Sequence, residues 1–459
     1  MTPPDPAISR PRTRSSLTIA AHFVVDVFSF VPIALMPALV FLLDIAPEQK
    51  ALLLGIGSVA SGAIQPLVAW LSDRLDTKAI STLGMVVAVL AIGNLGMART
   101  FDQLMLLYAI GVAGVGAYHP PAAAAVGLLA GRHRARWIAL FFLFGMIGGI
   151  VGNKFTPGYV EALGRAPDGS INLRDGLLDL RWTIPIGLVV AGVLAWSLRG
   201  VGKRANGAAR TDTGWEQAER RLRWRAVALL YFSNMIRFGV NMSLIYLFTE
   251  WAVEHTLARN NATVVTEALS AASSRVNGNL QAAMQVGMGG GGLVLGFVLA
   301  ARFEKAVFFV FPALGALAIL GITVADDVVP GLAVPLAVLG SVLSGLGFGA
   351  VIPVSISLAQ RMLPHRMSLA SGLMLGGAWC FAFVGPLIVE LVQNGLAGKR
   401  AAPSWLIERA HALPAWLGDP ILDGMGLDAG FVVTAGALFL AGLITLGLPR
   451  DLMLKTHQQ

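Results

Sequence analysis

Charged residues are scarce in this sequence. Only 13% of its 459 residues are Asp, Glu, Lys or Arg, whereas 56% are hydrophobic and a further 53 are glycine. Soluble domains carry about 25% charged residues, because a water-facing surface needs them. The shortage excludes a soluble globular protein of this size and predicts an integral membrane protein, with the lipid bilayer as its surroundings.

Cysteine and the usual cofactor motifs are also missing. Cys380 is the one cysteine, so neither an intramolecular disulfide nor a Cys-based metal cluster can form. The glycine runs follow no strand, which excludes a phosphate-binding loop. We find no His/Glu spacing typical of a metal site and no convincing nucleophile arrangement. We therefore expect no metal, no cofactor, no catalytic residues and no enzymatic activity.

Long apolar runs are what the sequence has in abundance. A helix needs about 20 mostly apolar residues to cross the hydrocarbon core of a bilayer. The first run has no small-residue cleavage site, so we interpret it as a true span and not as a signal peptide. Prolines inside the fourth and tenth runs leave their ends least well defined. Twelve runs are long enough: Leu17–Leu43, Ala51–Leu71, Ala79–Ala98, Leu104–Ala130, Trp137–Tyr159, Trp182–Leu198, Ala226–Thr249, Leu280–Ala300, Val307–Val324, Leu332–Ala359, Ser368–Val392 and Ala429–Leu448.

The distribution of basic residues predicts the orientation. An even number of spans puts both termini on one side, and the connections on that side carry about twice as many Lys and Arg residues as the opposite loops. Such an excess marks the cytoplasm, so we predict cytoplasmic termini and a multi-pass protein of the plasma (bacterial inner) membrane. The net charge of +8 then reflects basic loops, and we expect no nucleic-acid partner.

The longest polar cytoplasmic stretch divides the twelve spans into two sets of six. We predict five parts: a cytoplasmic tail at 1–16, a six-helix bundle at 17–199, a basic cytoplasmic linker at 200–225, a second six-helix bundle at 226–448 and a cytoplasmic tail at 449–459. A twofold repeat of six spans is typical of secondary transporters.

Short basic turns after spans two and eight carry a resemblance to a known family. Residues 69–78 read AWLSDRLDTK and residues 296–305 read GFVLAARFEK. Both resemble the cytoplasmic signature of the major facilitator superfamily, although Ala301 stands where the signature has an aspartate. The resemblance implies a monomeric all-α membrane protein of twelve transmembrane helices in two pseudo-symmetric six-helix bundles. Asp73, Arg74, Lys78 and Arg302 are then the predicted cytoplasmic gate.

A narrower resemblance points to the fosmidomycin-resistance branch of that superfamily. It rests on HFVVD at 22–26 and ALMP at 34–37, YHP at 118–120, Arg237, and QRMLPHR at 360–366 followed by ASGLMLG at 370–376. Characterised members export a phosphonate antibiotic, which implies proton-coupled efflux and drug resistance. Pro121 stands where this branch commonly has an acidic residue. If that acid carries the proton in the relatives, this protein couples protons differently.

Arg237 is the clearest candidate for contact with substrate. It lies in the middle of span seven, and Asn234 and Asn241 share its helical face at i, i+3, i+7 spacing. A permanently charged fork beside two amides suits an anion. The alternative is a structural salt bridge that never touches substrate. Gln281 and Gln285 in span eight are further candidates for a polar substrate, or else they bond neighbouring helices.

Three ionisable residues are candidates for proton coupling. His22 and Asp26 are i, i+4 on span one and share a face. A carboxylate this deep in the membrane tends to take up a proton, and we hypothesise that Asp26 faces Arg237 across the cavity. Asp26 as a fixed counter-ion, and His22 as a packing residue, are the alternatives. His119, in span four, is a candidate for both proton and substrate, or it simply bonds the carbonyls that Pro120 and Pro121 leave free.

Taken together, these features predict a secondary active transporter that works by alternating access. Proton-coupled efflux of a small anionic or drug-like compound is the leading interpretation, with the substrate and protons as partners. Uptake of a nutrient anion or a sugar derivative is the alternative within this class. A transporter-like sensor or scaffold that does not transport is the alternative outside it. Close-packed glycines in span five (Gly145, Gly148, Gly149, Gly152) and in span eight (Gly287 and 289–292) are expected to bring helices together.

Overall fold

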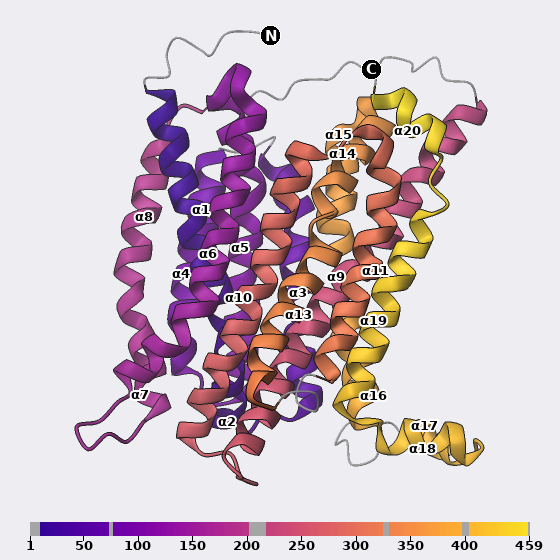
Figure 1. Ribbon diagram of the computed structural model, residues 1–459. Coiled ribbons are helices and arrows are strands. Elements are labelled where there is room, and N and C mark those ends of the chain that lie inside the picture. Colours follow the sequence, from indigo (N-terminus) through magenta and orange to yellow (C-terminus); the bar gives the residue numbers. More distant parts are fainter. Residues whose placement is uncertain (1–9, 73–76, 202–216, 325–329, 397–403, 458–459) are drawn as a thin grey trace.

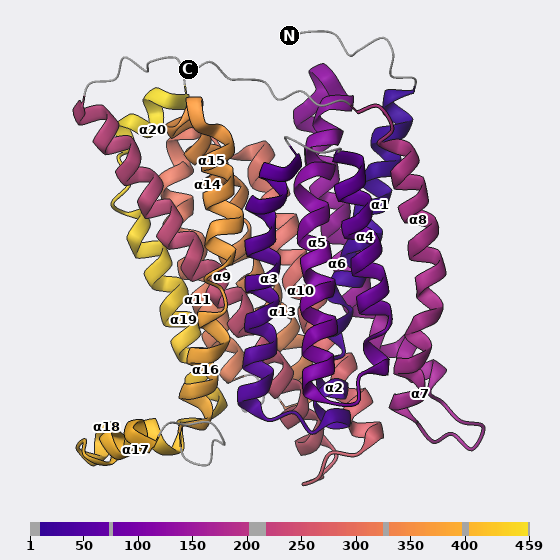
Figure 2. The same cartoon turned by 180° about the vertical axis from the view of Figure 1, so that it is seen from behind.

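The computed structural model describes residues 10–72, 77–201, 217–324, 330–396 and 404–457. These residues form a bundle of long helices that run roughly side by side, and an isolated bridge between Arg165 and Ile171 is the one β-type pairing among them (Figures 1 and 2). Helix α1 begins and helix α20 ends at the same end of the bundle. We call this the terminal end, and we call the opposite end the distal end.

The helices fall into two halves, which are joined through residues outside the described ranges. The amino-terminal half contains α1 (Pro11–Ala34), α2 (Met36–Leu43), α3 (Pro47–Ser72), α4 (Thr77–Gly93), α5 (Phe101–Ala130), α6 (Arg134–Leu163), α7 (Leu173–Leu178) and α8 (Ile184–Ser197). The carboxyl-terminal half contains α9 (Gln217–Arg259), α10 (Glu267–Val298), α11 (Glu304–Thr323), α13 (Ala333–Gly349), α14 (Ile352–Met362), α15 (Met367–Gly372), α16 (Val384–Asn394), α17 (Ser404–His411), α18 (Ala415–Asp423), α19 (Gly426–Thr445) and α20 (Arg450–His457).

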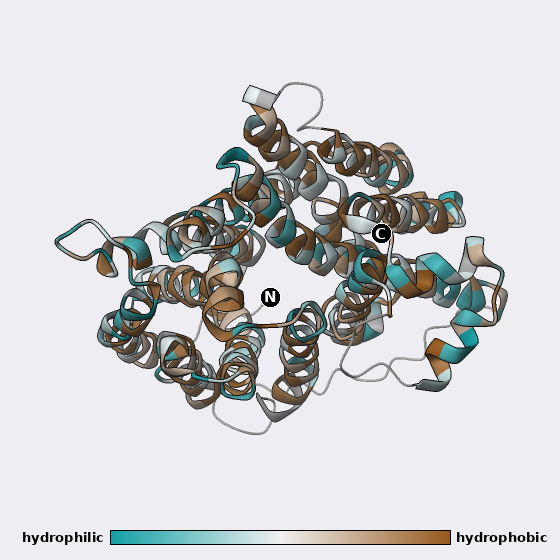
Figure 3. Cartoon of the chain, turned by 90° about the horizontal axis from the view of Figure 1, so that it is seen from below, coloured by the Kyte–Doolittle hydropathy of each residue, from teal (hydrophilic) through white to brown (hydrophobic). Residues whose placement is uncertain are grey.

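Each of the twelve predicted spans coincides with a helix or with consecutive helices. Eight helical segments of the described chain are long and apolar enough to cross a membrane. The other four predicted spans correspond to α4, which is shorter, to α9 and α10, which carry more polar residues, and to the interrupted segment from α15 to α16. Figure 3, seen from the distal end, shows apolar positions along most of the helices. The prediction of an all-helical, multi-pass membrane protein is confirmed.

Three spans differ from the simple runs predicted. The first breaks at Leu35, between α1 and α2, and the tenth breaks between α13 and α14 beside Pro353. The eleventh contains a π-helical turn at Leu373–Gly377. Proline lacks a backbone N–H, and irregular backbone within a bundle is tolerated where neighbouring helices cover it. The fourth span is an exception, because α5 runs as one helix through both Pro120 and Pro121.

The spans at the distal end are longer than predicted. Helix α9 is 43 residues long and ends at Arg259, and α10 already begins at Glu267. Both extensions are rich in polar residues, which hydropathy assigns to loops. Two short helices that follow the eleventh span, α17 and α18, lie across the distal end beside α16 (Figures 1 and 2).

The glycines of α6 bring that helix against α1, as predicted. A Cβ added at Gly152 would lie 2.6 Å from the carbonyl oxygen of Val27, and one at Gly148 would overlap the carbonyl oxygen of Phe23. Only a residue without a side chain allows the two backbones to approach this closely. Helix α1 is therefore held in a fixed position and rotation, which fixes the direction of its ionisable side chains.

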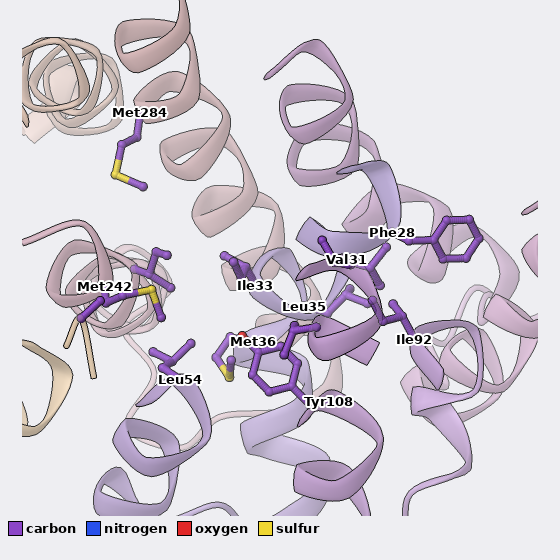
Figure 4. Close-up of a cluster of buried hydrophobic side chains, with 14 of the residues drawn as sticks. Phe28, Val31, Ile33, Leu35, Met36, Leu54, Ile92, Tyr108, Met242 and Met284 are labelled. Atoms are coloured by element: carbon purple, nitrogen blue, oxygen red, sulfur yellow. The ribbon is translucent and has the colours of Figure 1, made fainter. Parts of the chain in front are cut away.

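The two halves meet through a buried apolar cluster toward the distal end. Figure 4 shows Met36 and Leu54 of the first half opposite Met242 and Met284 of the second. Each of these four side chains is at most 2% exposed. Polar contacts between the halves gather at the same end, including an ion pair between Lys50 on α3 and Glu250 on α9. The two halves are therefore held together at the distal end, which is closed in this conformation.

Candidate functional site

Three ionisable side chains from two helices converge within the amino-terminal half. Asp26 and His22 lie one turn apart on α1, and His119 lies on α5. Oδ2 of Asp26 is 3.4 Å from Nε2 of His22, and Oδ1 of Asp26 is 3.3 Å from Nε2 of His119. One carboxylate thus faces two imidazoles, one with each oxygen.

The other nitrogen of each imidazole is already committed. Nδ1 of His22 lies 2.6 Å from the carbonyl oxygen of Phe141, and Nδ1 of His119 lies 2.7 Å from that of Val115. A carbonyl oxygen can only accept a hydrogen bond, so both Nδ1 atoms carry a hydrogen. In a neutral imidazole the remaining nitrogen, Nε2, then has a lone pair and no hydrogen.

Each of the two contacts of Asp26 needs a hydrogen to be attractive. With Asp26 ionised and both imidazoles neutral, each carboxylate oxygen faces the lone pair of one Nε2 atom, at 3.4 Å for His22 and 3.3 Å for His119. Neither contact then has a hydrogen between its two atoms. A proton bound by the carboxylate or by either imidazole converts one of these repulsive contacts into a hydrogen bond. A second proton does the same for the other contact. The two contacts thus have places for one or two additional hydrogens.

His22 is buried within the protein, whereas Asp26 and His119 are partly accessible. His22 is 2% exposed and stacks on the ring of Phe141, with 3.8 Å between ring centroids. The side chains of Asp26 and His119 are 13% and 27% exposed. A Cβ at Gly145 would lie 2.6 Å from Oδ2 of Asp26, so the glycine leaves the space that the carboxylate occupies.

The ligand atoms of these three side chains all lie within 4.8 Å of one another. Among the described residues, this is the group of His and Asp side chains that is close enough together to hold a metal ion. Metal ligands point at one ion from about 2.0–2.2 Å. Here each carboxylate oxygen instead faces its own imidazole nitrogen. Two separate N···O contacts suit protons held between atom pairs better than one central ion.

Arg237 lies in the other half, at the middle of α9. Its side chain is fully buried, Nη1 donates to Oδ1 of Asn234 at 3.2 Å, and Nη2 donates to the carbonyl oxygen of Phe308 at 3.2 Å. Nε has no partner in the structure. Among the residues described, no carboxylate pairs with this guanidinium. A buried cation with neutral partners and one unused donor can still receive an anion.

Of the four amide candidates, Asn234 is the one that bonds Arg237. Asn234 donates to Oγ of Ser355 at 2.8 Å, which positions it beside Arg237. Asn241 contacts the sulfur of Met284, and Gln281 donates to Oδ1 of Asn277 at 3.2 Å. The Oε1 atom of Gln285 is buried and has no partner. All four amides are at most 5% exposed, so they bond the protein interior in this conformation.

The hypothesis of facing Asp26 and Arg237 side chains finds no support in these contacts. Asp26 pairs with His22 and His119, whereas Arg237 turns to Asn234 and Phe308 within its own half. His119 also bonds the carbonyl of Val115 and not those of Gly116 and Ala117, the two that Pro120 and Pro121 leave without a helical donor. The two halves thus hold separate polar centres.

The predicted cytoplasmic gate lies largely beyond the described part of the chain. Asp73 and Arg74 fall outside the described residues, and Lys78 lies on α4 with its side chain outside them. Arg302 is exposed and its guanidinium lies 4.7 Å from the centre of the Phe303 ring.

Sequence analysis missed the polar contacts that join the halves at the distal end. Besides Lys50 and Glu250, Arg275 of α10 pairs with Glu161 of α6. Three further side chains of α10, Ser270, Ser274 and Asn277, bond the backbone of the first span. Their i, i+4, i+7 spacing was a readable signal, but hydropathy placed all three in a loop before the eighth span.

Comparisons with known proteins agree with this architecture. The model of the Major Facilitator Superfamily matches residues 18–386. No curated protein matches the sequence. A solved bacterial homologue of the human lysosomal transporter Spinster, in an inward-facing and unoccupied conformation, has a TM-score of 0.67 and 18% identity, over 98% of this chain and 99% of that chain.

Two other solved structures show the same likeness. A bacterial homologue of the human drug peptide transporters has a TM-score of 0.64 and 14% identity, over 97% of this chain and 99% of that chain. The fucose:proton symporter of E. coli has a TM-score of 0.56 and 12% identity, over 96% of this chain and 99% of that chain. At these identities the likeness concerns the fold.

Proposed function

The chain belongs to the major facilitator superfamily, and from that premise we propose that it is a proton-coupled transporter that exports a small anionic or drug-like compound. The observation that carries the proton coupling is the contact of Asp26 with His22 and His119, whose Nδ1 atoms are committed to carbonyl oxygens. A proton here replaces repulsion by a hydrogen bond.

The coupling mechanism follows from how charge changes at this cluster. When Asp26 is ionised and both imidazoles are neutral, the cluster carries one negative charge. One proton makes it neutral and two make it positive. Because a net charge inside a membrane is costly, the protonation state affects which side the half-buried cluster can face. Proton binding and release on opposite sides then drive the conformational cycle.

The anionic class of substrate rests on Arg237. Its buried guanidinium has no acidic partner in the described chain, and its Nε atom is unused. An anion that reached this position would satisfy a charge-assisted hydrogen bond and would neutralise a buried cation. Asn234 and Asn241 flank it on α9 and would orient the anion.

Efflux is supported by the narrower resemblance described above, and orientation is supported by the basic residues. The excess of Lys and Arg supports a cytoplasmic position for the terminal end. The distal end, where the two halves are in contact, is then the side that faces away from the cytoplasm. A proton-coupled symporter shares this fold, so the fold itself is compatible with either direction of transport.

Substrate-stimulated proton movement in proteoliposomes tests the proposal. We would offer phosphonates, sugar phosphates, carboxylates and lipophilic drugs under a pH gradient of either sign, to wild type and to the Asp26→Asn variant. We expect one anionic class to move protons in exchange for substrate, and Asp26→Asn to abolish that movement while the protein still inserts. Proton movement that survives in Asp26→Asn would refute coupling through this cluster. Movement of protons together with substrate would establish uptake instead, and ligand binding without any counterflow would establish a sensor.

A further inference from the structure

The first span is broken at the distal end. Helix α1 ends at Ala34, α2 begins at Met36, and Leu35 between them has φ −91° and ψ 6°. Pro37 has no backbone N–H, so it cannot make the bond to the carbonyl of Ile33 that a continuous helix would have. The break is deeply buried, with Leu35 and Met36 at most 1% exposed. Its backbone groups therefore need partners from other helices.

Helix α10, in the opposite half, supplies these partners. Asn277 donates from Nδ2 to the carbonyl oxygen of Ile33 at 2.8 Å, and Ser270 donates from Oγ to that of Pro37 at 3.2 Å. Oγ of Ser274 accepts a hydrogen bond from the backbone N–H of Ala38 at 3.2 Å. Ser270, Ser274 and Asn277 are each at most 2% exposed.

The three side chains form one row. Their spacing of four and three residues puts them on one face of α10, at successive turns. The backbone groups that they bond belong to Ile33, Pro37 and Ala38, on both sides of the break at Leu35. Serine hydroxyls on a helix usually bond a carbonyl of their own helix. Ser273, also on α10, does so with Leu269 at 2.9 Å. The row is therefore an exception that needs a reason.

We propose that the row Ser270–Ser274–Asn277 and the break at Leu35 form a latch that holds the distal end of the carrier closed. When the halves separate at this end, the Ala38 N–H and the Ile33 and Pro37 carbonyls lose their partners together. Only water entering from the distal side can replace them, because lipid offers no hydrogen bonds. The latch thus opens only toward water, and closing it again restores three hydrogen bonds at once.

The latch is independent of the coupling ion and of the substrate, and so goes beyond the proposed function. It concerns the balance between the closed and open distal end. Each hydrogen bond lost in the closed state lowers the ratio of closed to open molecules by about twofold to tenfold. Only hydrogen bonds that cross between the halves should change this ratio. Ser273, which bonds Leu269 within its own helix, therefore serves as the control.

The reactivity of one buried cysteine measures this balance. We would place Met36→Cys in a Cys380→Ser background, in nanodiscs, where a water-soluble maleimide reaches both faces. Position 36 is fully buried in the closed conformation, so the labelling rate follows the fraction of open molecules. We expect the triple variant Ser270→Ala, Ser274→Ala, Asn277→Ala to label at least about tenfold faster than its parent. The matched variant Ser273→Ala, which removes a buried hydroxyl from the same helix, should label within about twofold of its parent.

Pro37→Ala provides a second measurement that guards against general loosening. The alanine restores a backbone N–H for the Ile33 carbonyl, so that carbonyl depends less on Asn277. We expect Asn277→Ala to accelerate labelling less in the Pro37→Ala background than in the parent. Equal labelling of the triple variant and Ser273→Ala would overturn the proposal. So would an Asn277→Ala effect that is the same with and without Pro37, because general loosening would act equally in both.

Discussion

Nε2 of His119, on α5, lies 3.3 Å from Oδ1 of Asp26, on α1, while Oδ2 of the same carboxylate faces His22. One acidic side chain thus contacts an imidazole of its own helix and an imidazole of α5. Both histidines donate their Nδ1 hydrogens to backbone carbonyls. A hydrogen between Asp26 and either Nε2 atom must therefore come from a proton that the ionised carboxylate and the neutral imidazoles do not carry. This relationship leads to the first two predictions.

Replacing Asp26 by asparagine should uncouple transport from protons. The amide has nearly the shape of the carboxylate, carries no charge, and donates permanently to one imidazole, so it resembles the protonated state. We expect substrate exchange to persist and its dependence on pH, between about pH 5 and 8, to flatten. Radiolabelled exchange in proteoliposomes across that range checks this. A pH profile identical to wild type would contradict it.

Replacing Gly145 by alanine should displace the cluster. The new Cβ would lie 2.6 Å from Oδ2 of Asp26 and would overlap the ring of His22. We expect proton coupling to fall and stability to decrease by about 1–3 kcal/mol, the usual cost of overpacking. Gly158 is the matched control on the same helix, since nothing lies within 4 Å of a Cβ there. Proton flux and thermal unfolding of the two alanine variants provide the comparison, and equal effects would argue against it.

Replacing Arg237 by lysine should weaken anion binding although the charge is kept. The three donors of a lysine ammonium lie on one nitrogen, so they cannot reproduce the planar fork in which Nη1 bonds Asn234, Nη2 bonds the Phe308 carbonyl and Nε stays available for substrate. We expect the KM for an anionic substrate to rise by about tenfold or more. Arg14→Lys is the control, because Arg14 is also a buried arginine that donates to a carbonyl, that of Ser197 at 2.7 Å. If both variants lose stability and neither changes KM, Arg237 is structural.

The ion pair of Lys50 and Glu250 should stabilise the closed distal end. Lys50 is 1% exposed, and its ammonium also lies 3.8 Å from the centre of the Tyr246 ring. We expect Lys50→Met and Glu250→Gln each to lower thermal stability, and the double variant to lose less than the sum by about 0.5–3 kcal/mol. Unfolding of the four proteins in one detergent measures this coupling. Strictly additive losses would show that the two side chains act independently.

Apolar patterning was sufficient to predict the fold but not the ends of its helices. Twelve runs were visible because lipid accepts only apolar surfaces, and each coincides with helix. The predicted helix ends were wrong where the polar residues of a helix face the other half of the protein instead of lipid. Ser270 and Asn277 lie on α10 and face the first span, yet hydropathy starts the helix only after them, at Leu280.

The candidate site was predictable within one helix and not between helices. The i, i+4 spacing of His22 and Asp26 puts them on one face of α1 whatever the rest of the fold does. The approach of His119 depends on how α5 packs against α1, which no spacing within the chain encodes. The same reason explains why the pairing expected for Asp26 and Arg237 was not found. Residues on pseudo-symmetric spans can each be central and still turn toward their own half.

Helix α9 runs as one continuous helix from one end of the bundle to the other. At 43 residues it is roughly 65 Å long, about twice the thickness of the hydrocarbon core. Near one end Arg223 is bonded to the carbonyls of Arg361 and Met362, near the other Glu250 holds Lys50, and Arg237 lies between them. If the helix tilts as one unit, its two ends move in opposite directions, and the contacts at one end loosen as those at the other tighten. The anion that we propose for Arg237 would then touch the helix between its two ends and could affect both.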